Sequence, residues 1–361
     1  MRVVSLNEYT DAQLRRLCAR IGLASRVDEV CSVVTDLLGP AGTRALTDPP
    51  LWRSDVADDH TPLEYSVAFE QDGSATLRLL VECVARKPNP RSNLRAGLAA
   101  LNRLAERYPL STDRLEAVRD LFLPDDPRGL FSLWFSIVVT AADLRVKVYL
   151  NPEVRGAHRA PGLVSEGLHR LGLGEGFRTL TEHTARPGST LDRFSFFALD
   201  LDDTPRSRVK VYQSHDRCSV RDLRRSAAAC GDADDTQLTE FGALVGGLDC
   251  YEGRPLVSSH TFLGGQAEPS GFSLYLPVRD YVRDDAVALA RTRALLVRHG
   301  LDHTALDRVV DAVRDRPLES GPGLIAHVSL RMGRPRPGVT VYLSAEAYGG
   351  TADAGARVGA A

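Results

Sequence analysis

The strongest constraint on the fold is a short β-rich segment that recurs along the chain and ends in tyrosine. The pentapeptide Arg-Val-Lys-Val-Tyr occurs twice, at 145–149 and 208–212. Similar alternating segments end at Tyr275 and Tyr342, so the four tyrosines are 63, 63 and 67 residues apart. A period of this length indicates an internal repeat whose units pack against one another.

Each of these segments follows another run of strand composition, so every unit begins with a hairpin. The preceding runs are 130–139, 194–201, 257–263 and 324–331. A fifth pair of runs, 64–70 and 76–83, flanks the turn at 71–74. Stretches of helical composition follow the hairpins, at 93–107, 219–229, 237–245, 285–298 and 304–314. The unit therefore reads ββαα, and five units give ten strands.

Ten antiparallel strands joined by hairpins do not suit a parallel doubly wound sheet, because parallel strands need a crossover after every strand. Closure into a barrel removes both sheet edges and leaves a lumen that can hold a ligand. The helices must then lie outside, and the opening helices at 11–21 and 26–38 pad the wall. We predict an α+β fold: a ten-stranded antiparallel β-barrel with a polar lumen, ringed by outer helices and built from five ββαα repeats.

The composition is that of a soluble globular chain, with 43% hydrophobic and 25% charged residues. We predict one barrel domain over 1–350, with its N-terminal helices within 1–45, and a disordered tail at 351–361. No stretch reaches the roughly 20 apolar residues of a membrane helix, and the first thirty residues lack a signal core. We expect a cytoplasmic protein without a membrane partner. The net charge of -2 argues against a nucleic-acid partner.

Strand parity places the charged residues of the repeat inside the barrel. Side chains alternate between the two faces of a strand. One face therefore carries Arg145, Lys147 and Tyr149 in one unit, and Arg208, Lys210 and Tyr212 in the next. The intervening valines form an apolar face that suits the outer helices. The polar face must then line the lumen.

A cationic lumen requires a strongly negative ligand, because unpaired buried charges are costly. Arginine, lysine and tyrosine hydroxyl groups suit a phosphate or a diphosphate. The aromatic faces of the four tyrosines add attraction for a carbocation. Cations for a leaving diphosphate and rings for the allyl cation that it leaves behind are the two halves of a prenyl-transfer site.

The sequence resembles the aromatic prenyltransferases of the αββα barrel type, specifically the bacterial branch of the tryptophan dimethylallyltransferase (indole prenyltransferase) family. The residues that carry this resemblance follow one another along nearly the whole chain: Pro62-Leu63-Glu64-Tyr65-Ser66, Arg78, Lys147-Val148-Tyr149, Arg208-Val209-Lys210-Val211-Tyr212, Tyr275 and Tyr342. The resemblance implies a diphosphate site made of Arg78, Lys147, Arg208, Lys210 and Tyr275. It also implies an allyl-cation shield made of Tyr149, Tyr212, Tyr275 and Tyr342.

The same resemblance implies that Glu64 is the catalytic carboxylate, which accepts a hydrogen bond from the indole N–H. Arg193 and Asn151 are the further candidates for binding the amino-acid acceptor. Members that alkylate C4 of the indole often have a tyrosine where this chain has Asn151, and they use a lysine that the run 130–139 lacks. Ser273 stands where the family often has glutamine. These differences disfavour attack at C4.

The expected activity is transfer of a dimethylallyl group from its diphosphate to the benzene ring of L-tryptophan by electrophilic aromatic substitution. C6 is favoured, with C5 or C7 open. One alternative keeps the fold and the donor but takes another indole or a phenolic or phenazine acceptor. Another is a non-catalytic isoprenoid diphosphate carrier. The partners are then two small molecules, and the protein is a monomer or a homodimer.

No metal or cofactor is expected, because the luminal cations can take the place of a metal. The D-D-x-x-D pattern that binds Mg²⁺ is absent, and the acidic runs 200–203, 125–126 and 234–235 are expected in turns or at helix starts. His299 and His303 have i, i+4 spacing, but Gly300 breaks the helix that would align them. The six cysteines show no zinc spacing, so we interpret them as reduced thiols.

Structural roles compete with some of these functional ones. Lys147 and Lys210 could form salt bridges across neighbouring strands, and Glu64 could be a carboxylate at the rim of the barrel. Four aromatic residues are expected to pack in the wall or against helices, without contacting substrate: Trp134, Phe194, Phe196 and Phe197.

Overall fold

Ten antiparallel strands close into a barrel in the order β1-β12-β11-β10-β9-β6-β5-β4-β3-β2. The computed structural model describes residues 3–349 apart from 72, 185, 187–189, 232, 265, 267 and 334–337. The barrel strands are β1 (Leu63–Phe69), β2 (Ala75–Glu82), β3 (Leu133–Val139), β4 (Leu144–Leu150), β5 (Asp192–Asp200), β6 (Val209–His215), β9 (Leu256–Phe262), β10 (Gly271–Leu276), β11 (Ile325–Gly333) and β12 (Gly338–Ser344). The predicted fold class is confirmed.

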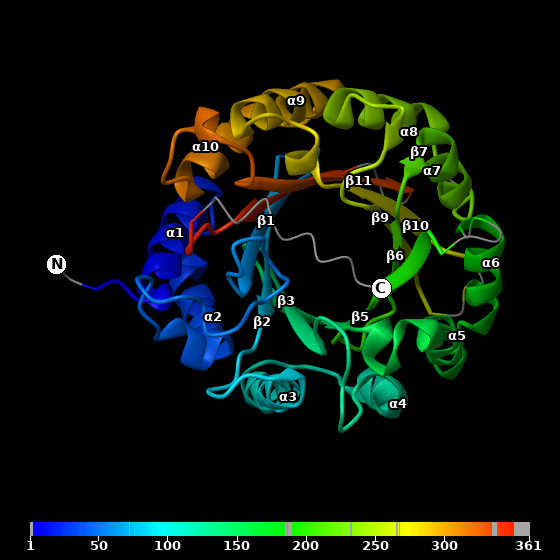
Figure 1. Cartoon of the computed structure of the whole chain (residues 1–361), viewed down its shortest axis with the longest axis horizontal. Coiled ribbons are helices and arrows are strands. Elements are labelled where there is room, and N and C mark those ends of the chain that lie inside the picture. The colour runs from blue at the N-terminus through cyan, green and yellow to red at the C-terminus, as the bar shows by residue number, and fades with distance from the viewer. Residues whose placement is uncertain are drawn as a thin grey trace.

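In the described part of the chain, ten helices ring the barrel (Figure 1). They are α1 (Leu6–Arg20), α2 (Val27–Gly42), α3 (Pro90–Arg107), α4 (Asp113–Phe122), α5 (Ala160–Arg170), α6 (Gly174–Thr184), α7 (Val220–Ala227), α8 (Asp235–Phe241), α9 (Asp285–Arg298) and α10 (His303–Val313). Two helices follow each of the first four hairpins. The ring closes with α1 and α2, which lie between α10 and α3. A small sheet of β7 (Cys218–Ser219) and β8 (Cys250–Tyr251) lies outside the barrel order.

Several helices begin at side chains that satisfy their free backbone N–H groups. Ser5 and Glu8 form a capping box at the start of α1, and Asn89 caps α3 just before Pro90. Asp234 accepts hydrogen bonds from two backbone N–H groups at the start of α8, so the expectation of a helix start at 234–235 is confirmed.

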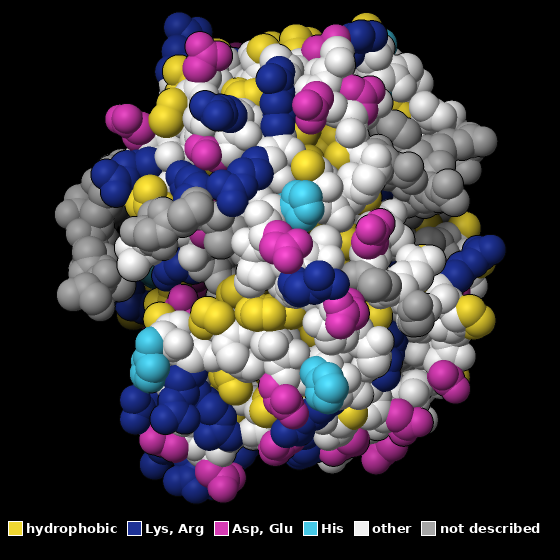
Figure 2. Space-filling view, turned by 90° about the vertical axis from the view of Figure 1, so that its right-hand side faces the viewer, with side chains coloured by type: hydrophobic (Ala, Val, Ile, Leu, Met, Phe, Trp, Pro, Cys, Tyr) yellow, Lys and Arg dark blue, Asp and Glu magenta, His cyan; other side chains and the backbone are white. Residues whose placement is uncertain are grey.

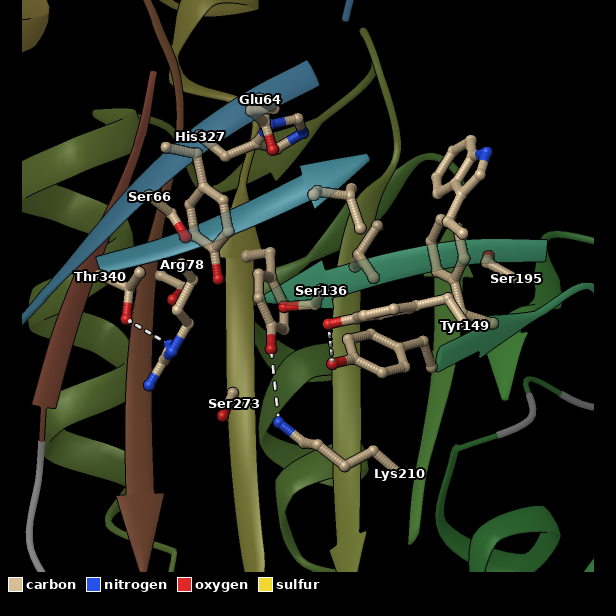
Figure 3. Close-up of a pocket in the computed structure, with 18 of the residues that line it drawn as sticks. Glu64, Ser66, Arg78, Ser136, Tyr149, Ser195, Lys210, Ser273, His327 and Thr340 are labelled. Atoms are coloured by element: carbon tan, nitrogen blue, oxygen red, sulfur yellow. Dashed lines mark hydrogen bonds between the residues drawn. The ribbon is translucent and has the colours of Figure 1, made fainter. Parts of the chain in front are cut away.

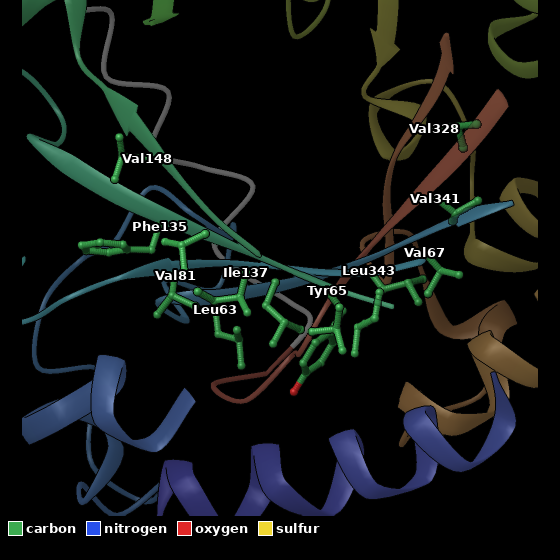
Figure 4. Close-up of a cluster of buried hydrophobic side chains, with 14 of the residues drawn as sticks. Leu63, Tyr65, Val67, Val81, Phe135, Ile137, Val148, Val328, Val341 and Leu343 are labelled. Carbon is green, nitrogen blue, oxygen red and sulfur yellow. The ribbon is translucent and has the colours of Figure 1, made fainter. Parts of the chain in front are cut away.

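The outer face of the wall and the inner faces of the helices share the hydrophobic core. Leu63, Tyr65 and Leu343 point from the wall toward neighbouring helices (Figure 4) and are fully buried. The Tyr65 hydroxyl donates a hydrogen bond of 3.0 Å to Gln13 Oε1 on α1, which satisfies its polar end. Apolar residues therefore face outward to the helices, as the valine pattern predicts.

Two β-bulges interrupt the alternation of side chains. The register shifts between Phe194 and Phe196 in β5, and between Ile325 and His327 in β11. Phe194 packs on Phe177 of α6, with ring centroids 5.9 Å apart, whereas Phe196 lines the lumen. Ile325 likewise belongs to the outer core and His327 lines the lumen. The extra residue in each bulge thus turns the second side chain inward.

Basic and acidic side chains are interspersed over the face shown in Figure 2. None of the helices in the described part of the chain combines the length and the apolar character needed to cross a bilayer. The six cysteines form no disulfides. The tail predicted at 351–361 lies outside the described residues.

Candidate active site

The lumen holds a cavity of about 350 Å³ (Figure 3). All the residues that the sequence nominates for the site line it: Glu64, Arg78, Lys147, Tyr149, Asn151, Arg193, Arg208, Lys210, Tyr212, Tyr275 and Tyr342. Arg145 does not line the cavity, although it shares a strand face with Lys147. It lies near the start of β4, is half exposed and forms an ion pair with Asp143 at 3.2 Å.

Four cations converge at one end of the cavity. Arg78 comes from β2, Lys147 from β4 and Lys210 from the start of β6, and Arg208 directly precedes β6. Burial lowers the pKa of Lys147 to about 7 and holds the pKa of Lys210 well below its ordinary value. An anion bound here would favour the ammonium forms of both lysines.

Asp200 lies within this cationic cluster, which corrects the expectation that it is a turn residue. It ends β5 opposite Lys147, with its carboxylate oxygens 3.3 Å from Lys147 Nζ and 2.7 Å from Arg208 Nε. Burial alone would raise the pKa of Asp200, but the two positive charges hold it well below its ordinary value. Lys147 therefore does form the cross-strand salt bridge that the sequence left open, and it lines the cavity as well.

Four tyrosines form a continuous chain of rings above the cations. Consecutive ring centroids are 5.6 Å apart for Tyr149 and Tyr212, 5.7 Å for Tyr212 and Tyr275, and 5.9 Å for Tyr275 and Tyr342. Lys210 Nζ donates to the Tyr275 hydroxyl at 3.5 Å.

Burial raises the pKa of Tyr149, Tyr212 and Tyr342 far above the ordinary value of a phenol. These side chains are neutral phenols, which offer their ring faces to a cation without presenting a nucleophilic phenolate.

An apolar group of aromatic residues lines the cavity beside the tyrosines. The Trp134 ring stacks on Phe131 with centroids 4.2 Å apart and lies 5.6 Å from the Phe196 ring. The expectation that Trp134 and Phe196 do not face the ligand space is wrong, because both line the cavity. Trp134 shares the luminal face of β3 with Ser136, and the bulge turns Phe196 inward. Phe194 and Phe197 pack outside the lumen, as expected.

Glu64 lies near the start of β1, away from the cations, and next to His327 (Figure 3). It is only 7% exposed, so the alternative of an exposed rim carboxylate does not hold. Burial raises its pKa to about 8, opposed by the positive charge of Arg279. Asp58 forms ion pairs with Arg279 at 2.6 Å and with Arg254 at 2.8 Å. A carboxyl group in this setting has a high proton affinity and is readily used as a hydrogen-bond acceptor once ionised.

Sequence reasoning missed His327, Arg279 and Asp58. His327 lines the cavity, and its ring meets that of Tyr342 edge-on with centroids 6.2 Å apart. Burial, together with the charges of Arg279 and Arg254, holds the pKa of His327 well below its ordinary value, so the imidazole is neutral. Asp58 precedes β1 and Arg279 follows β10, so both lie outside the strands, where the strand pattern carries no information about them.

Of the other two nominated acceptor residues, Arg193 lies exposed at the edge of the cavity and Asn151 is buried in its lining. The Arg193 side chain is 49% exposed and lies 3.4 Å from Glu153. Asn151 is buried, donates a hydrogen bond of 2.7 Å to the Phe131 carbonyl and accepts one of 2.8 Å from the Glu153 N–H. Its amide therefore fixes the turn that carries Glu153, while Arg193 remains accessible to a ligand.

Within the described ranges, no group of three or more His, Cys, Asp or Glu side chains could hold a metal ion. His299 follows the end of α9 and His303 begins α10, so they do not share a helix. Gly300 between them has a φ of 66°, a conformation that glycine adopts without strain.

Comparisons with known proteins agree with this geometry. The sequence profile of tryptophan dimethylallyltransferase matches residues 27–358. The chain is 49% identical to the 6-dimethylallyltryptophan synthase of Micromonospora olivasterospora, solved with DMASPP and Trp, with a TM-score of 0.93 over 96% of this chain and 99% of that one. It is 48% identical to another structure described as a 6-dimethylallyl tryptophan synthase, with a TM-score of 0.92 over 97% and 99% of the two chains.

A third similar structure is the 5-dimethylallyltryptophan synthase of Streptomyces coelicolor. It is 39% identical, with a TM-score of 0.89 over 96% of this chain and 99% of that one. The matched profile spans most of the chain, and these identities extend over nearly all of it. The chain therefore belongs to the tryptophan dimethylallyltransferase family.

Proposed function

We propose that this protein transfers the dimethylallyl group of dimethylallyl diphosphate to C6 of the indole ring of L-tryptophan. The observation that carries the proposal is the order of groups along one lumen: buried cations, then a chain of neutral tyrosine rings, then a buried carboxyl group. Two of the similar structures are 6-dimethylallyltryptophan synthases.

The cationic end binds the donor. Arg78, Lys147, Arg208 and Lys210, with the Tyr275 hydroxyl, hold the diphosphate through charge-assisted hydrogen bonds. These bonds strengthen as the C1–O bond breaks and negative charge develops on the leaving group, so they lower the barrier to ionisation. The same cations supply the charge neutralisation that a metal would otherwise provide, and we propose that no metal is required.

The tyrosine rings protect the cation that forms. The faces of Tyr149, Tyr212, Tyr275 and Tyr342 attract the dimethylallyl cation, each by roughly 0.5 to 2 kcal/mol. C1 then bonds to a carbon of the indole ring, and loss of the proton from that carbon restores aromaticity.

Glu64 and the aromatic residues hold the acceptor. The ionised carboxylate of Glu64 accepts a hydrogen bond from the indole N–H, which raises the electron density of the ring. Trp134 and Phe196 provide an apolar surface for the ring, and Arg193 at the mouth pairs with the carboxylate of the amino acid. Asn151 contributes by fixing the turn beside Arg193.

The ring position follows from the two anchors. The cations fix the donor and Glu64 fixes the indole nitrogen, so rotation of the ring decides which carbon lies at roughly 3–3.5 Å from C1. β3 carries no lysine that could act near C4, and Asn151 stands where members that alkylate C4 have a tyrosine. This arrangement favours the far edge of the benzene ring, at C6.

Incubation of the protein with dimethylallyl diphosphate and L-tryptophan, followed by mass and NMR analysis of the product, tests the proposal. A dominant 6-dimethylallyltryptophan product is expected. A C5, C7 or C4 product would overturn the ring position, and transfer only to another indole or to a phenol would overturn the acceptor. Diphosphate binding without transfer to any acceptor would indicate a carrier.

A further inference from the structure

We propose that Asp200 is a positioning residue of the donor site, which keeps Lys147 in its ammonium form and Arg208 in place before the diphosphate binds. This inference rests on the proposed function, because it takes the cationic end of the lumen to be the donor site. It assigns a role to a negative charge that lies in the middle of a site for an anion.

The contacts of Asp200 fix its carboxylate between the two cations. One oxygen accepts hydrogen bonds from Arg208 Nε at 2.7 Å and from the Arg208 backbone N–H at 3.1 Å. The other lies 3.3 Å from Lys147 Nζ. Arg114 of α4 donates to the backbone carbonyl of Asp200 at 3.1 Å, so the end of β5 is held from outside the barrel as well. The carboxylate is therefore fixed on both sides and orients the cations that it contacts.

Lys147 needs a nearby negative charge to stay protonated. Burial and neighbouring positive charges both favour the neutral amine. The charged and titratable groups that act on it are Asp200 of β5, Arg208 directly before β6, Lys210 of β6 and Tyr275 of β10. Its Nζ also lies 5.8 Å from the centroid of the Tyr149 ring. The pKa of Lys147 is about 7 with Asp200 in place. Loss of the carboxylate would lower it further and leave a neutral amine, which is a weak partner for a diphosphate.

The direct effect of Asp200 on a bound diphosphate is repulsive, and this repulsion can be separated from the proposed role. The pKa of Asp200 is held well below its ordinary value, so its charge is constant across the neutral range. The repulsion is therefore independent of pH. The protonation of Lys147 changes across the same range, so the proposed role gives a pH-dependent effect. Asp200 also raises the lowered pKa of Lys210, so the contributions of the two lysines must be separated by experiment.

The test compares Asp200→Asn with the wild-type chain for binding of inorganic diphosphate, by calorimetry between about pH 5.5 and about pH 8.5. The ratio of the variant's dissociation constant to that of the wild type should increase by about tenfold or more from the low to the high end of this pH range. Above the pKa of Lys147, each unit by which that pKa falls weakens diphosphate binding by a factor of about ten. Titration of the diphosphate itself cancels in this ratio. A ratio that is constant with pH would overturn the proposal.

Asp192→Asn is the matched control at the other end of β5. The Asp192 side chain is only 5% exposed, forms an ion pair with Arg186 at 2.8 Å and a hydrogen bond with His215 Nδ1 at 2.8 Å, and does not line the luminal cavity. This variant should lose stability but keep the wild-type pH dependence of diphosphate binding. Asp200→Glu, which restores the charge, should bring that dependence back toward wild type. If the Asn variant is unfolded, Asp200→Ser gives the same comparison with a smaller neutral side chain.

Two further measurements identify the titrating group. The chain has three lysines, Lys87, Lys147 and Lys210, so NMR of lysine-labelled protein follows each one. Lys147 should titrate at least one unit lower in Asp200→Asn, and an unchanged value would overturn the proposal. In a Lys147→Arg background the dependence of the Asp200→Asn effect on pH should become smaller, because only the contribution of Lys210 remains. A dependence as large as in the wild-type background would assign the effect to Lys210 and overturn the proposal. Failure of the wild-type protein to bind diphosphate would instead overturn the proposed function, and this inference with it.

Discussion

Glu64 should make the use of tryptophan strongly dependent on pH. Burial raises the pKa of Glu64 to about 8, with Arg279 opposing that rise. Below this pKa the free site holds a carboxylic acid, and above it a carboxylate, which is the better acceptor for the indole N–H. Activity should therefore rise with pH. The kcat/KM for tryptophan should be about one tenth of its plateau at pH 7 and about one hundredth at pH 6.

The assay measures initial rates of prenyltryptophan formation by liquid chromatography, with the donor saturating so that bound diphosphate keeps Lys147 and Lys210 protonated. Glu64→Gln is the control, because its amide keeps nearly the same shape and does not titrate. It should lower the plateau by about 10²–10⁴-fold and remove the rise with pH.

Asp58→Asn gives an independent check, since the negative charge of Asp58 raises the pKa of Glu64 and pairs with Arg279. Its profile should move to lower pH. A wild-type profile that is flat from about pH 6 to about pH 9, or nearly wild-type turnover by Glu64→Gln, would refute the assigned role of this carboxyl group.

Four other outcomes are expected. Activity should persist in EDTA without added divalent metal, and a strict Mg²⁺ requirement would contradict the role given to the luminal cations. Lys210→Arg should lower kcat/KM for the donor by about tenfold or more, because a planar guanidinium presents its donors differently from a compact ammonium. In steady-state kinetics, Trp134→Ala should raise the KM for tryptophan and leave the KM for the donor unchanged. A larger rise in the KM for the donor would contradict the assignment of Trp134 to the acceptor half of the site. Phe135→Ala, on the fully buried outer face, should lower the free energy of unfolding by about 3–5 kcal/mol in urea titrations, and a loss below about 1 kcal/mol would contradict its place in the core.

The strands and the face that each presents to the lumen could be predicted because both depend on local patterns. The spacing of the tyrosines fixes the repeat, and alternation within Arg-Val-Lys-Val-Tyr separates the luminal residues from the wall residues. The structure places Lys147, Tyr149, Lys210 and Tyr212 in one cavity, as that pattern predicts.

The misses at Phe196 and His327 come from the two bulges, and the miss at Asp200 comes from long-range pairing. Strict alternation from Phe194 or from Ile325 would turn Phe196 and His327 outward, and an extra residue in each strand reverses this. Asp200 resembles a turn residue within an acidic run, and only the register between β4 and β5 brings it opposite Lys147. That register depends on the whole barrel, so a local pattern could not reveal it.

The alternation of apolar and luminal side chains along each strand has a consequence for how this protein can change. Trp134 and Phe135 are neighbours in β3, yet the first faces the ligand cavity and the second faces the helices. A mutation that reshapes the lumen therefore leaves the packing between wall and helices in place. Single luminal substitutions can therefore change the acceptor preference while each successive variant stays folded. Libraries restricted to luminal positions should retain a high proportion of folded variants.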